Sequence, residues 1–363
     1  MQQGIATLVD YGADPAMFLA ALRRMPGFDD VAADDLDAMP VKGLVHAHIR
    51  IRGRGLVLRV PRLSHFGHDP VHSLAYQAAC FERAWPSGVT PELHGVIPVQ
   101  PGIPNGALVV EEIIGRALRL PDDLPAVARC LAAIHMLPVP EAGDCAPLSL
   151  HDDPVAATLA VIEAQAAYLP ETGFAPDALA QIADEIAWAR EFAIQCARNA
   201  GNVGGDQPIT LVGTDTHPGN YLIDEAGRAV FVDLEKGLYG APAIDLAHAS
   251  VYTSTMWERD SATALKADDV AAFYGHYLEC VPAELGDRVE PWFAPLRRLT
   301  WLRTTTWCAK WWVEAARPAD DTPGRAASWS ADRLDPDHIA GVRARIRDYY
   351  DPDTITRIRS EWN

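Results

Sequence analysis

The sequence predicts an α+β protein of two lobes, with a small antiparallel sheet in the first lobe and a larger, mostly helical second lobe. Its 363 residues are 49% hydrophobic, which suffices for a large core and exceeds one ordinary domain. Short, β-rich apolar segments typical of strands lie in the first third of the chain. Apolar residues at helical spacing dominate most of the remainder.

The first third begins with a helix and continues into a hairpin. Residues 14–25 start with Asp-Pro and carry an apolar stripe at helical spacing. The acidic run 29–37 is expected to be a solvated connection. Alternating residues at 43–51 and 56–61, separated by a turn with two glycines, predict an antiparallel hairpin. A second helical pattern follows at 71–85.

The rest of the chain is predicted to be helical around one irregular segment near residue 215. Helical patterns cover 124–137, most of 145–205, and the residues from 245 onward. The pattern at 301–314 contains four tryptophans. Such a stripe is typical of core packing; the alternative is an aromatic box for a quaternary ammonium group. The core interpretation is the commoner one.

Charge and cysteine content narrow the classes of function. With 31 basic and 49 acidic residues the net charge is −18, which argues against binding nucleic acid or an anionic membrane. It is compatible with a cationic small-molecule partner. The six cysteines are widely spaced without a Cys-x-x-Cys pair, which favours free thiols in a reducing compartment. The first residues lack a basic and apolar leader pattern, so a cytoplasmic location is expected.

The most informative stretch runs from Leu211 to Asp224 and continues to Glu235. Two apolar runs flank a polar turn containing Pro-Gly, which predicts a hairpin-like pair of strands around a loop. This loop would bring Asp215, Asn220 and Asp233 close together. A carboxylate that accepts a proton, with amide and carboxylate oxygens for a hard metal ion, is what phosphoryl transfer from a nucleotide–magnesium complex requires.

At these residues the chain resembles the aminoglycoside phosphotransferase and choline kinase-like family of small-molecule kinases. The family loop His-Gly-Asp-x-His-x-x-Asn aligns with 213–220, and its Asp-x-Glu strand end aligns with 233–235. Its Gly-Asp-Pro-x-x-Asp-Leu-Ala element is similar to 240–247. The resemblance implies a bilobal protein-kinase-like fold, ATP and Mg²⁺ as cofactors, and phosphate transfer to the hydroxyl of a small molecule such as an amino sugar or choline-like alcohol.

The resemblance also implies roles for the loop residues. Asp215 is expected to accept the proton of the acceptor hydroxyl, and Asn220 and Asp233 to hold magnesium, with Glu235 contributing through water. Asp245 is expected to hold the catalytic loop through backbone N–H groups. Gly213 stands where the family has a scaffold histidine, which predicts an altered loop rigidity more than altered chemistry.

In the first lobe the resemblance assigns nucleotide contacts. Gly43 aligns with a turn over the phosphates, and Arg59 with the cation that holds them. The family's helix carries a glutamate that orients this cation. Here the aligned position falls near Gln77, whereas Glu82 is the only acidic residue of the helix; Glu82 is favoured because a carboxylate pairs better with a guanidinium.

The segment 108–116 is similar to the family's hinge strand, whose backbone groups hold the adenine. The backbone groups of Glu111 and Ile113 are therefore expected to contact the nucleotide base. The hinge sets the expected lobes at 1–113 and 114–363.

Other functions fit the sequence less well. A metallophosphoesterase would need further ordered His and Asp ligands, and after Asn220 only three scattered histidines remain. No P-loop motif Gly-x-x-x-x-Gly-Lys-Ser/Thr occurs. A kinase-like protein that binds nucleotide or ligand without transfer is the remaining alternative. The acceptor's identity and the oligomeric state have no sequence signal.

Overall fold

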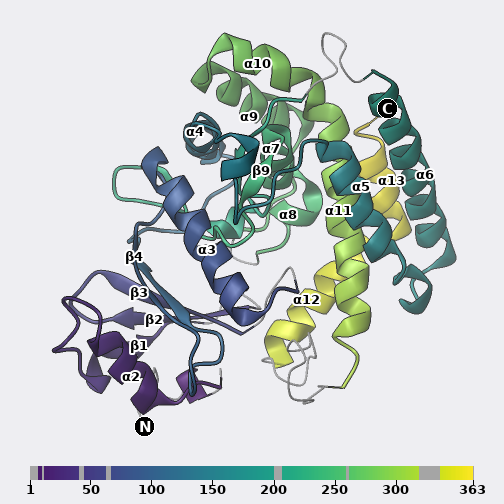
Figure 1. The fold of residues 1–363 in the computed structure, drawn as a ribbon. Coiled ribbons are helices and arrows are strands. Elements are labelled where there is room, and N and C mark those ends of the chain that lie inside the picture. Colours follow the sequence, from purple (N-terminus) through teal and green to yellow (C-terminus); the bar gives the residue numbers. More distant parts are fainter. Residues whose placement is uncertain are drawn as a thin grey trace. The chain divides into compact units, whose positions relative to one another are not determined.

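The chain forms two compact units (Figure 1). The first contains the described residues up to Ile114 together with Leu234–Lys236, and the second contains Gly115–Asp233 and the described residues from Gly237 onward. No helix in the described ranges is both long and apolar enough to cross a membrane. The computed structural model describes residues 7–9, 12–40, 45–62, 67–199, 207–258, 261–318 and 336–362.

The first unit is built on a five-stranded antiparallel sheet with the order β1-β2-β3-β5-β4. The predicted hairpin is confirmed, because β2 and β3 pair over their full length, His46 with Pro61 through Ile51 with Leu56. Two helices, α2 and α3, accompany the sheet. The elements are α2 (Pro15–Arg23), β1 (Leu36–Ala38), β2 (His46–Ile51), β3 (Leu56–Pro61), α3 (Pro70–Ala84), β4 (Leu93–Ile97) and β5 (Ala107–Glu111).

The two faces of this sheet have different chemistry because side chains alternate along a strand. On one face, Ile49 and Leu58 join a buried cluster with Phe18 and Leu22 of α2. On the other, His48 lies directly across from Arg59, whose guanidinium lies over the ring of Phe81 on α3. The alternation therefore gives one apolar face and one face that presents histidine and arginine.

Asp-Pro pairs begin several helices in the described ranges. At α2, α3, α5 (Pro154–Ala166) and α13 (Pro352–Arg359), the aspartate side chain accepts hydrogen bonds from backbone N–H groups of the first turn. Proline at the first helical position loses no intrahelical hydrogen bond. The helix start predicted at Asp14-Pro15 is thus confirmed.

Two features of the first unit differ from the sequence-based expectation. The acidic run ends in a strand, β1, because Leu36 is buried and Leu36–Ala38 pairs with β2. The strand β4 was not predicted; its register with β5 is interrupted between Leu93 and Gly95, which weakens the alternation that identifies a strand.

The second unit is mainly helical, as expected, with two small two-stranded sheets. Trp301 and Trp311 of α11 are fully buried, so the tryptophan-rich helix contributes to the core. The remaining elements are α4 (Leu124–His135), α6 (Pro176–Asn199), β6 (Thr210–Val212), β7 (Tyr221–Ile223), β8 (Ala229–Phe231), β9 (Leu238–Gly240), α7 (Pro242–Ser250), α8 (Tyr252–Thr255), α9 (Ala267–Cys280), α10 (Ala283–Val289), α11 (Phe293–Glu314) and α12 (Pro336–Tyr349).

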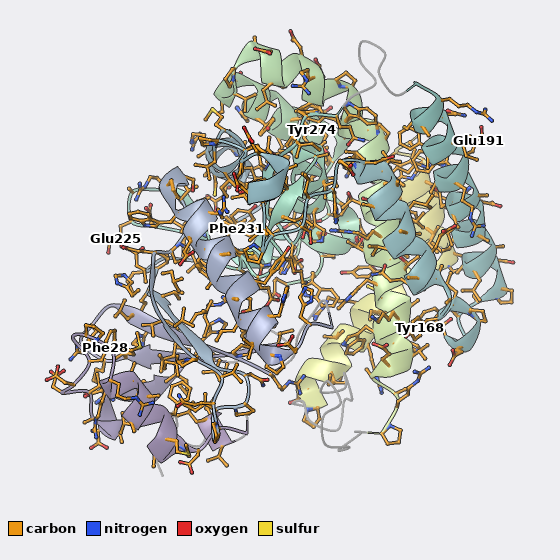
Figure 2. The ribbon with its side chains drawn as sticks, viewed as in Figure 1. Phe28, Tyr168, Glu191, Glu225, Phe231 and Tyr274 are labelled. Carbon is orange, nitrogen blue, oxygen red and sulfur yellow. The ribbon has the colours of Figure 1, made fainter. Side chains whose placement is uncertain are left out.

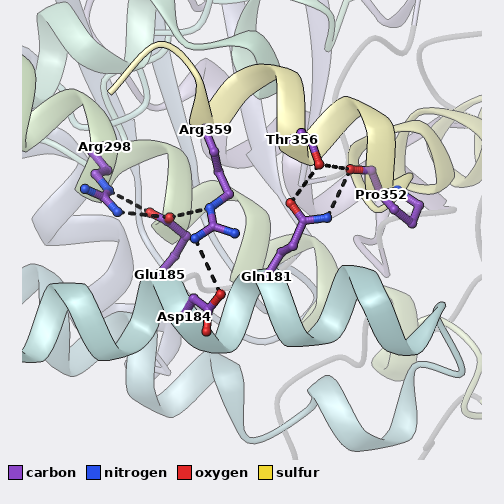
Figure 3. Close-up of polar contacts among 7 residues, drawn as sticks. All are labelled: Gln181, Asp184, Glu185, Arg298, Pro352, Thr356 and Arg359. Carbon is purple, nitrogen blue, oxygen red and sulfur yellow. Dashed lines mark hydrogen bonds and ion pairs between the residues drawn. The ribbon is translucent and has the colours of Figure 1, made fainter. Parts of the chain in front are cut away.

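A buried carboxylate joins three helices of the second unit (Figure 3). Glu185 of α6 has no exposed side-chain surface, and it accepts two hydrogen bonds from Arg298 of α11, at 2.7 and 3.0 Å. Arg359 of α13 donates to the same carboxylate at 2.7 Å. Arg298 also lies 3.9 Å from the ring centroid of Trp188. The network fastens the C-terminal helix to α6 and α11.

Candidate active site

The loop containing Asp215 lies between strands of two different sheets. Strand β6, which precedes it, pairs with β9, and β7, which follows it, pairs with β8. The expectation that the two runs flanking the loop would pair with each other is therefore wrong. The tight turn lies instead between β7 and β8, where the Asp224 carboxylate accepts from the backbone N–H of Arg228 at 2.8 Å.

Asp245 holds the loop through backbone N–H groups, as predicted. It is completely buried, and its two carboxylate oxygens accept from the backbone N–H groups of Gly213 and Thr214, both at 2.7 Å. The Thr216 hydroxyl donates to the Asp245 carbonyl at 2.7 Å. Charge-assisted bonds to a buried carboxylate are among the stronger hydrogen bonds in proteins. The backbone immediately before Asp215 is therefore fixed by a single side chain.

Gly213 is required by its neighbours. A Cβ atom there would lie 2.6 Å from the Phe231 ring and 3.0 Å from Thr216. Phe231 is fully buried in the interior of the second unit, whereas Glu225 is exposed on the β7–β8 turn (Figure 2). The phenylalanine ring thus packs where a side chain at 213 would project, and the loop keeps its backbone bonds without the family's histidine.

Thr214 has a left-handed backbone, with φ of 58°. The family pattern has glycine here, which adopts this conformation without steric cost. For a β-branched residue the conformation is a genuine outlier that costs about 1–2 kcal/mol. It persists because the surroundings hold the peptide on both sides, with Asp245 on the Thr214 N–H and Arg303 of α11 on the Thr214 carbonyl, at 2.7 Å.

Two basic side chains of the second unit lie near Asp215. Nε2 of His248 on α7 lies 3.7 Å from an Asp215 carboxylate oxygen, and the Asp215 side chain is 20% exposed. Burial lowers the pKa of Arg303, and the carboxylates of Asp215 and Asp245 oppose that shift. An arginine keeps its charge under such a shift. The Asp215 carboxylate is therefore partly accessible and lies close to the positive charge of Arg303.

Asn220 and Asp233 lie at the same end of the β7–β8 hairpin. The Val232 N–H donates to the Asn220 carbonyl at 2.9 Å, which places Asp233 one residue beyond this contact. The Asn220 Nδ2 atom donates to the Asp215 carbonyl at 2.7 Å, so its Oδ1 atom is the end suited to a metal. An amide oxygen and a carboxylate are hard ligands of the kind magnesium takes together with phosphate oxygens and water.

In the described part of the chain, no three His, Cys, Asp or Glu residues group into a metal site. A two-residue oxygen set matches a magnesium ion carried mainly by nucleotide phosphates. It does not fit a two-metal phosphoesterase centre, which would need several more ligands.

Two histidines support the loop. His135 of α4 is buried, with Nδ1 3.0 Å from the Tyr277 hydroxyl and Nε2 3.2 Å from an Asp245 oxygen. His217 accepts the Gly219 N–H at its Nδ1, at 3.2 Å. Both contacts agree with the expected packing roles, and His135 additionally orients the aspartate that holds the loop.

In the first unit, Arg59 is buried, at 4% exposure, and is not an exposed strand residue. Its Nη1 atom lies 3.3 Å from Nε2 of His48. Glu82 is exposed on α3 and forms no ion pair with Arg59 among the described contacts, so the predicted Arg59–Glu82 pair is not formed. The reason is helical phase: Gln77 is buried on α3, and Glu82 points away.

Gln77 binds His46 rather than Arg59. Its Oε1 atom lies 3.0 Å from His46 Nε2, and His46 Nδ1 lies 3.0 Å from a Glu235 oxygen. His46 and Glu235 are both nearly fully buried. Glu235 therefore contacts His46 of β2 directly, and its contribution to a metal through water stays a prediction.

The predicted hinge residues lie at the end of β5, whose last residue is Glu111. The Glu111 N–H donates to the Glu92 carbonyl at 2.9 Å. Ile113 lies just beyond the strand, and its N–H makes no hydrogen bond with the described residues. Its contact with the nucleotide base stays a prediction. Gly43, the predicted phosphate-loop residue, lies outside the described residues.

His48 is predicted to make the stability of the first unit depend on pH. Burial lowers the pKa of His48 well below its usual value, and the charges of Arg59 and His46 lower it further against a smaller opposing effect of Glu235. The unfolded chain then binds more protons below about pH 6.5, so stability is complete above that pH and is lost as pH falls.

We therefore expect the free energy of unfolding to fall by at least about 1 kcal/mol between pH 7 and pH 5, and this loss to shrink in His48→Gln. Urea unfolding across this range measures the effect. The control is His94→Gln, an exposed histidine of the same unit. Equal pH dependence in the wild type and His48→Gln would contradict the assignment.

Sequence reasoning missed Arg303, His248 and the strain at Thr214. A signal existed only for the last, because threonine replaces the glycine of the family loop directly before Asp215. Arg303 lies 89 residues from Thr214, the loop residue it contacts, and nothing in its local sequence indicates that contact.

Several solved structures with the same fold are small-molecule kinases. A choline kinase from Cryptosporidium parvum Iowa II matches with a TM-score of 0.56 at 13% identity, covering 96% of this chain and 97% of that one. A Plasmodium vivax ethanolamine kinase matches at 0.55 and 13%, covering 89% and 84%. An amicoumacin kinase in complex with AMP-PNP, Ca²⁺ and Ami matches at 0.55 and 14%, covering 96% and 97%. At these identities the likeness shows a shared bilobal kinase-like fold.

The sequence itself identifies the family. A search of curated proteins found no match. The sequence pattern of the phosphotransferase enzyme family, however, matches residues 47–282, more than half of the chain. This range includes β3, all of β2 except His46, the predicted hinge segment, the Asp215 loop and Asp245. The chain belongs to the phosphotransferase enzyme family.

Proposed function

We propose that this protein transfers the γ-phosphate of ATP to a hydroxyl group of a small molecule, with magnesium as the metal. The observation that carries the proposal is the loop held by Asp245, which fixes Asp215 and Asn220 in one short segment. The partly exposed Asp215 carboxylate is the group that would meet an acceptor. The amicoumacin kinase with bound AMP-PNP and Ca²⁺ shares the fold, which supports a nucleotide and a divalent ion here.

The chemical step requires little covalent work from the protein. The acceptor oxygen attacks the γ-phosphorus and forms a new P–O bond, while the bond from that phosphorus to the bridging oxygen breaks. ADP leaves with the bonding electron pair, and Asp215 accepts the hydroxyl proton. Its carboxylate needs only hydrogen-bond reach of the oxygen, because the transition state is loose.

Other residues bind and orient. Oδ1 of Asn220 and the carboxylate of Asp233 would hold magnesium, which when bound neutralises charge on the phosphates. Arg59 would contact the phosphates from the first unit as a two-pronged donor. The backbone of Glu111 and Ile113 would bind the adenine. Each of these assignments is part of the proposal.

The acceptor is a small alcohol whose identity the site does not specify. An aromatic cage for a quaternary ammonium finds little support, because the Trp312 ring already faces Arg343 and Arg347 and the Trp257 ring faces Arg345.

The test is a panel of amino sugars, amino alcohols, neutral sugars and other alcohols, each assayed for ADP release from ATP with magnesium. We expect at least one member to raise ADP release clearly above the rate without acceptor. Magnesium-dependent nucleotide binding with no acceptor-dependent release would favour a kinase-like protein that binds without transfer. Absence of both would overturn the proposal.

A further inference from the structure

The peptide group that joins Thr214 to Asp215 receives an unusual contact. Its carbonyl oxygen accepts a hydrogen bond at 2.7 Å from Nη2 of Arg303, a residue near the middle of α11. Asp245 holds the preceding peptide by the Thr214 N–H. Thr214 is therefore fixed through both of its peptide groups, one by an anion and one by a cation.

This pair of contacts opposes a local preference of the chain. A threonine at φ of 58° is strained relative to a negative φ. Rotation of Thr214 towards the relaxed region would turn the peptide that carries the Asp215 nitrogen, and so move the Asp215 carboxylate. Asp245 resists that rotation at one end only. The Arg303 bond resists it at the peptide next to Asp215.

Arg303 differs from the other arginines on its helix in what it binds. Arg298 binds the Glu185 carboxylate of α6 (Figure 3), and Arg297 binds Glu361, which lies just beyond α13. Both arginines therefore fasten α11 to other segments of the second unit. Within the described residues Arg303 forms no ion pair within 4.0 Å, and its hydrogen bond goes to the loop backbone. Removing the charge of an arginine from water costs free energy. The hydrogen bond that Arg303 makes in return is the one to the loop backbone.

We propose that Arg303 is a positioning residue for phosphoryl transfer, which holds the strained Thr214 peptide so that Asp215 faces the acceptor. The kinetic part of its test rests on the proposed function. The hydrogen-exchange part needs no acceptor. A glycine at position 214 would adopt this backbone conformation without strain and would need no restraint. Because this loop has threonine there, Arg303 supplies the restraint.

The experiment compares Arg303→Met, Arg303→Lys and Arg298→Met, with Arg303→Met repeated in a Thr214→Gly background. Amide hydrogen exchange at Gly213 and Thr214 reports on the loop, and steady-state kinetics with an accepted alcohol separate kcat from KM for ATP. Arg298→Met is the matched control because it removes another partly buried arginine of α11.

We expect Arg303→Met to speed exchange of the two loop amides at least about tenfold and to lower kcat about 30-fold, with KM for ATP within about threefold. Lysine retains a donor and should restore part of kcat. In the Thr214→Gly background, Arg303→Met should lower kcat only about threefold relative to Thr214→Gly alone. Arg298→Met should lower thermal stability while kcat stays within about threefold.

Unchanged exchange of both loop amides in Arg303→Met would overturn the inference, whatever the activity. So would a kcat loss of equal size in Arg298→Met, or in both the threonine and glycine backgrounds. If Arg303→Met does not fold, the lysine variant and the glycine-background variant carry the same comparisons. Absence of turnover in the wild type would count against the proposed function and leave the exchange result to judge the inference.

Discussion

Replacing Asp215 with asparagine is expected to lower kcat about 10³-fold while leaving nucleotide affinity within about threefold. The amide has the shape of the carboxylate but cannot accept the hydroxyl proton. The loop should keep its conformation, because Asp245 and Arg303 restrain its backbone. ADP release with an accepted alcohol measures kcat, and titration with AMP-PNP measures nucleotide affinity.

The control for this variant is Glu225→Gln, which removes an exposed carboxylate from the β7–β8 turn. Its kcat should equal that of the wild type. If Asp215→Asn turned over at the wild-type rate, Asp215 would have no part in proton transfer, and His248, at 3.7 Å, would be the next group to replace.

Asp245→Asn is expected to reduce both stability and activity. The substitution exchanges one of two accepting oxygens for an NH₂ group, so a buried backbone N–H of Gly213 or Thr214 faces another donor. It also removes the negative charge beside His135. We expect a loss of about 3–5 kcal/mol in the free energy of unfolding and, where the variant stays folded, a fall in kcat of at least about 100-fold.

Urea unfolding and kcat, measured at a temperature where the variant is native, separate the two effects. Asp177→Asn is a suitable control, because Asp177 is an exposed acid in the first turn of α6. A loss of stability below about 1 kcal/mol together with normal kcat would show that the loop does not depend on Asp245.

The elements best predicted from sequence were those whose signal is local. The β2–β3 hairpin follows from alternation and a turn with glycines at positive φ, and α2 follows from Asp14-Pro15. The role of Asp245 follows from its motif and is confirmed by its two backbone contacts. In the first two cases a few neighbouring residues determine the structure, whereas the Asp245 contacts span 32 and 31 residues and follow from the motif.

The predictions that failed depended on contacts between distant segments. Strand β6 pairs with β9 and not across its own loop, a choice that no residue of β6 encodes locally. Glu82 was favoured for its charge, but its position on α3 leaves it exposed while Gln77 is buried. Arg303 reaches the loop only because α11 packs against α7, so tertiary packing alone brings it to Thr214.

The central claim is that Asn220 and Asp233 hold a divalent ion together with the phosphates of ATP, and it can be tested without knowing the acceptor. The measurement is the affinity for AMP-PNP by calorimetry, with and without magnesium, in the wild type and in Asp233→Asn. We expect magnesium to tighten binding at least about tenfold in the wild type and to have little effect in the variant. The same gain from magnesium in both proteins would contradict the account.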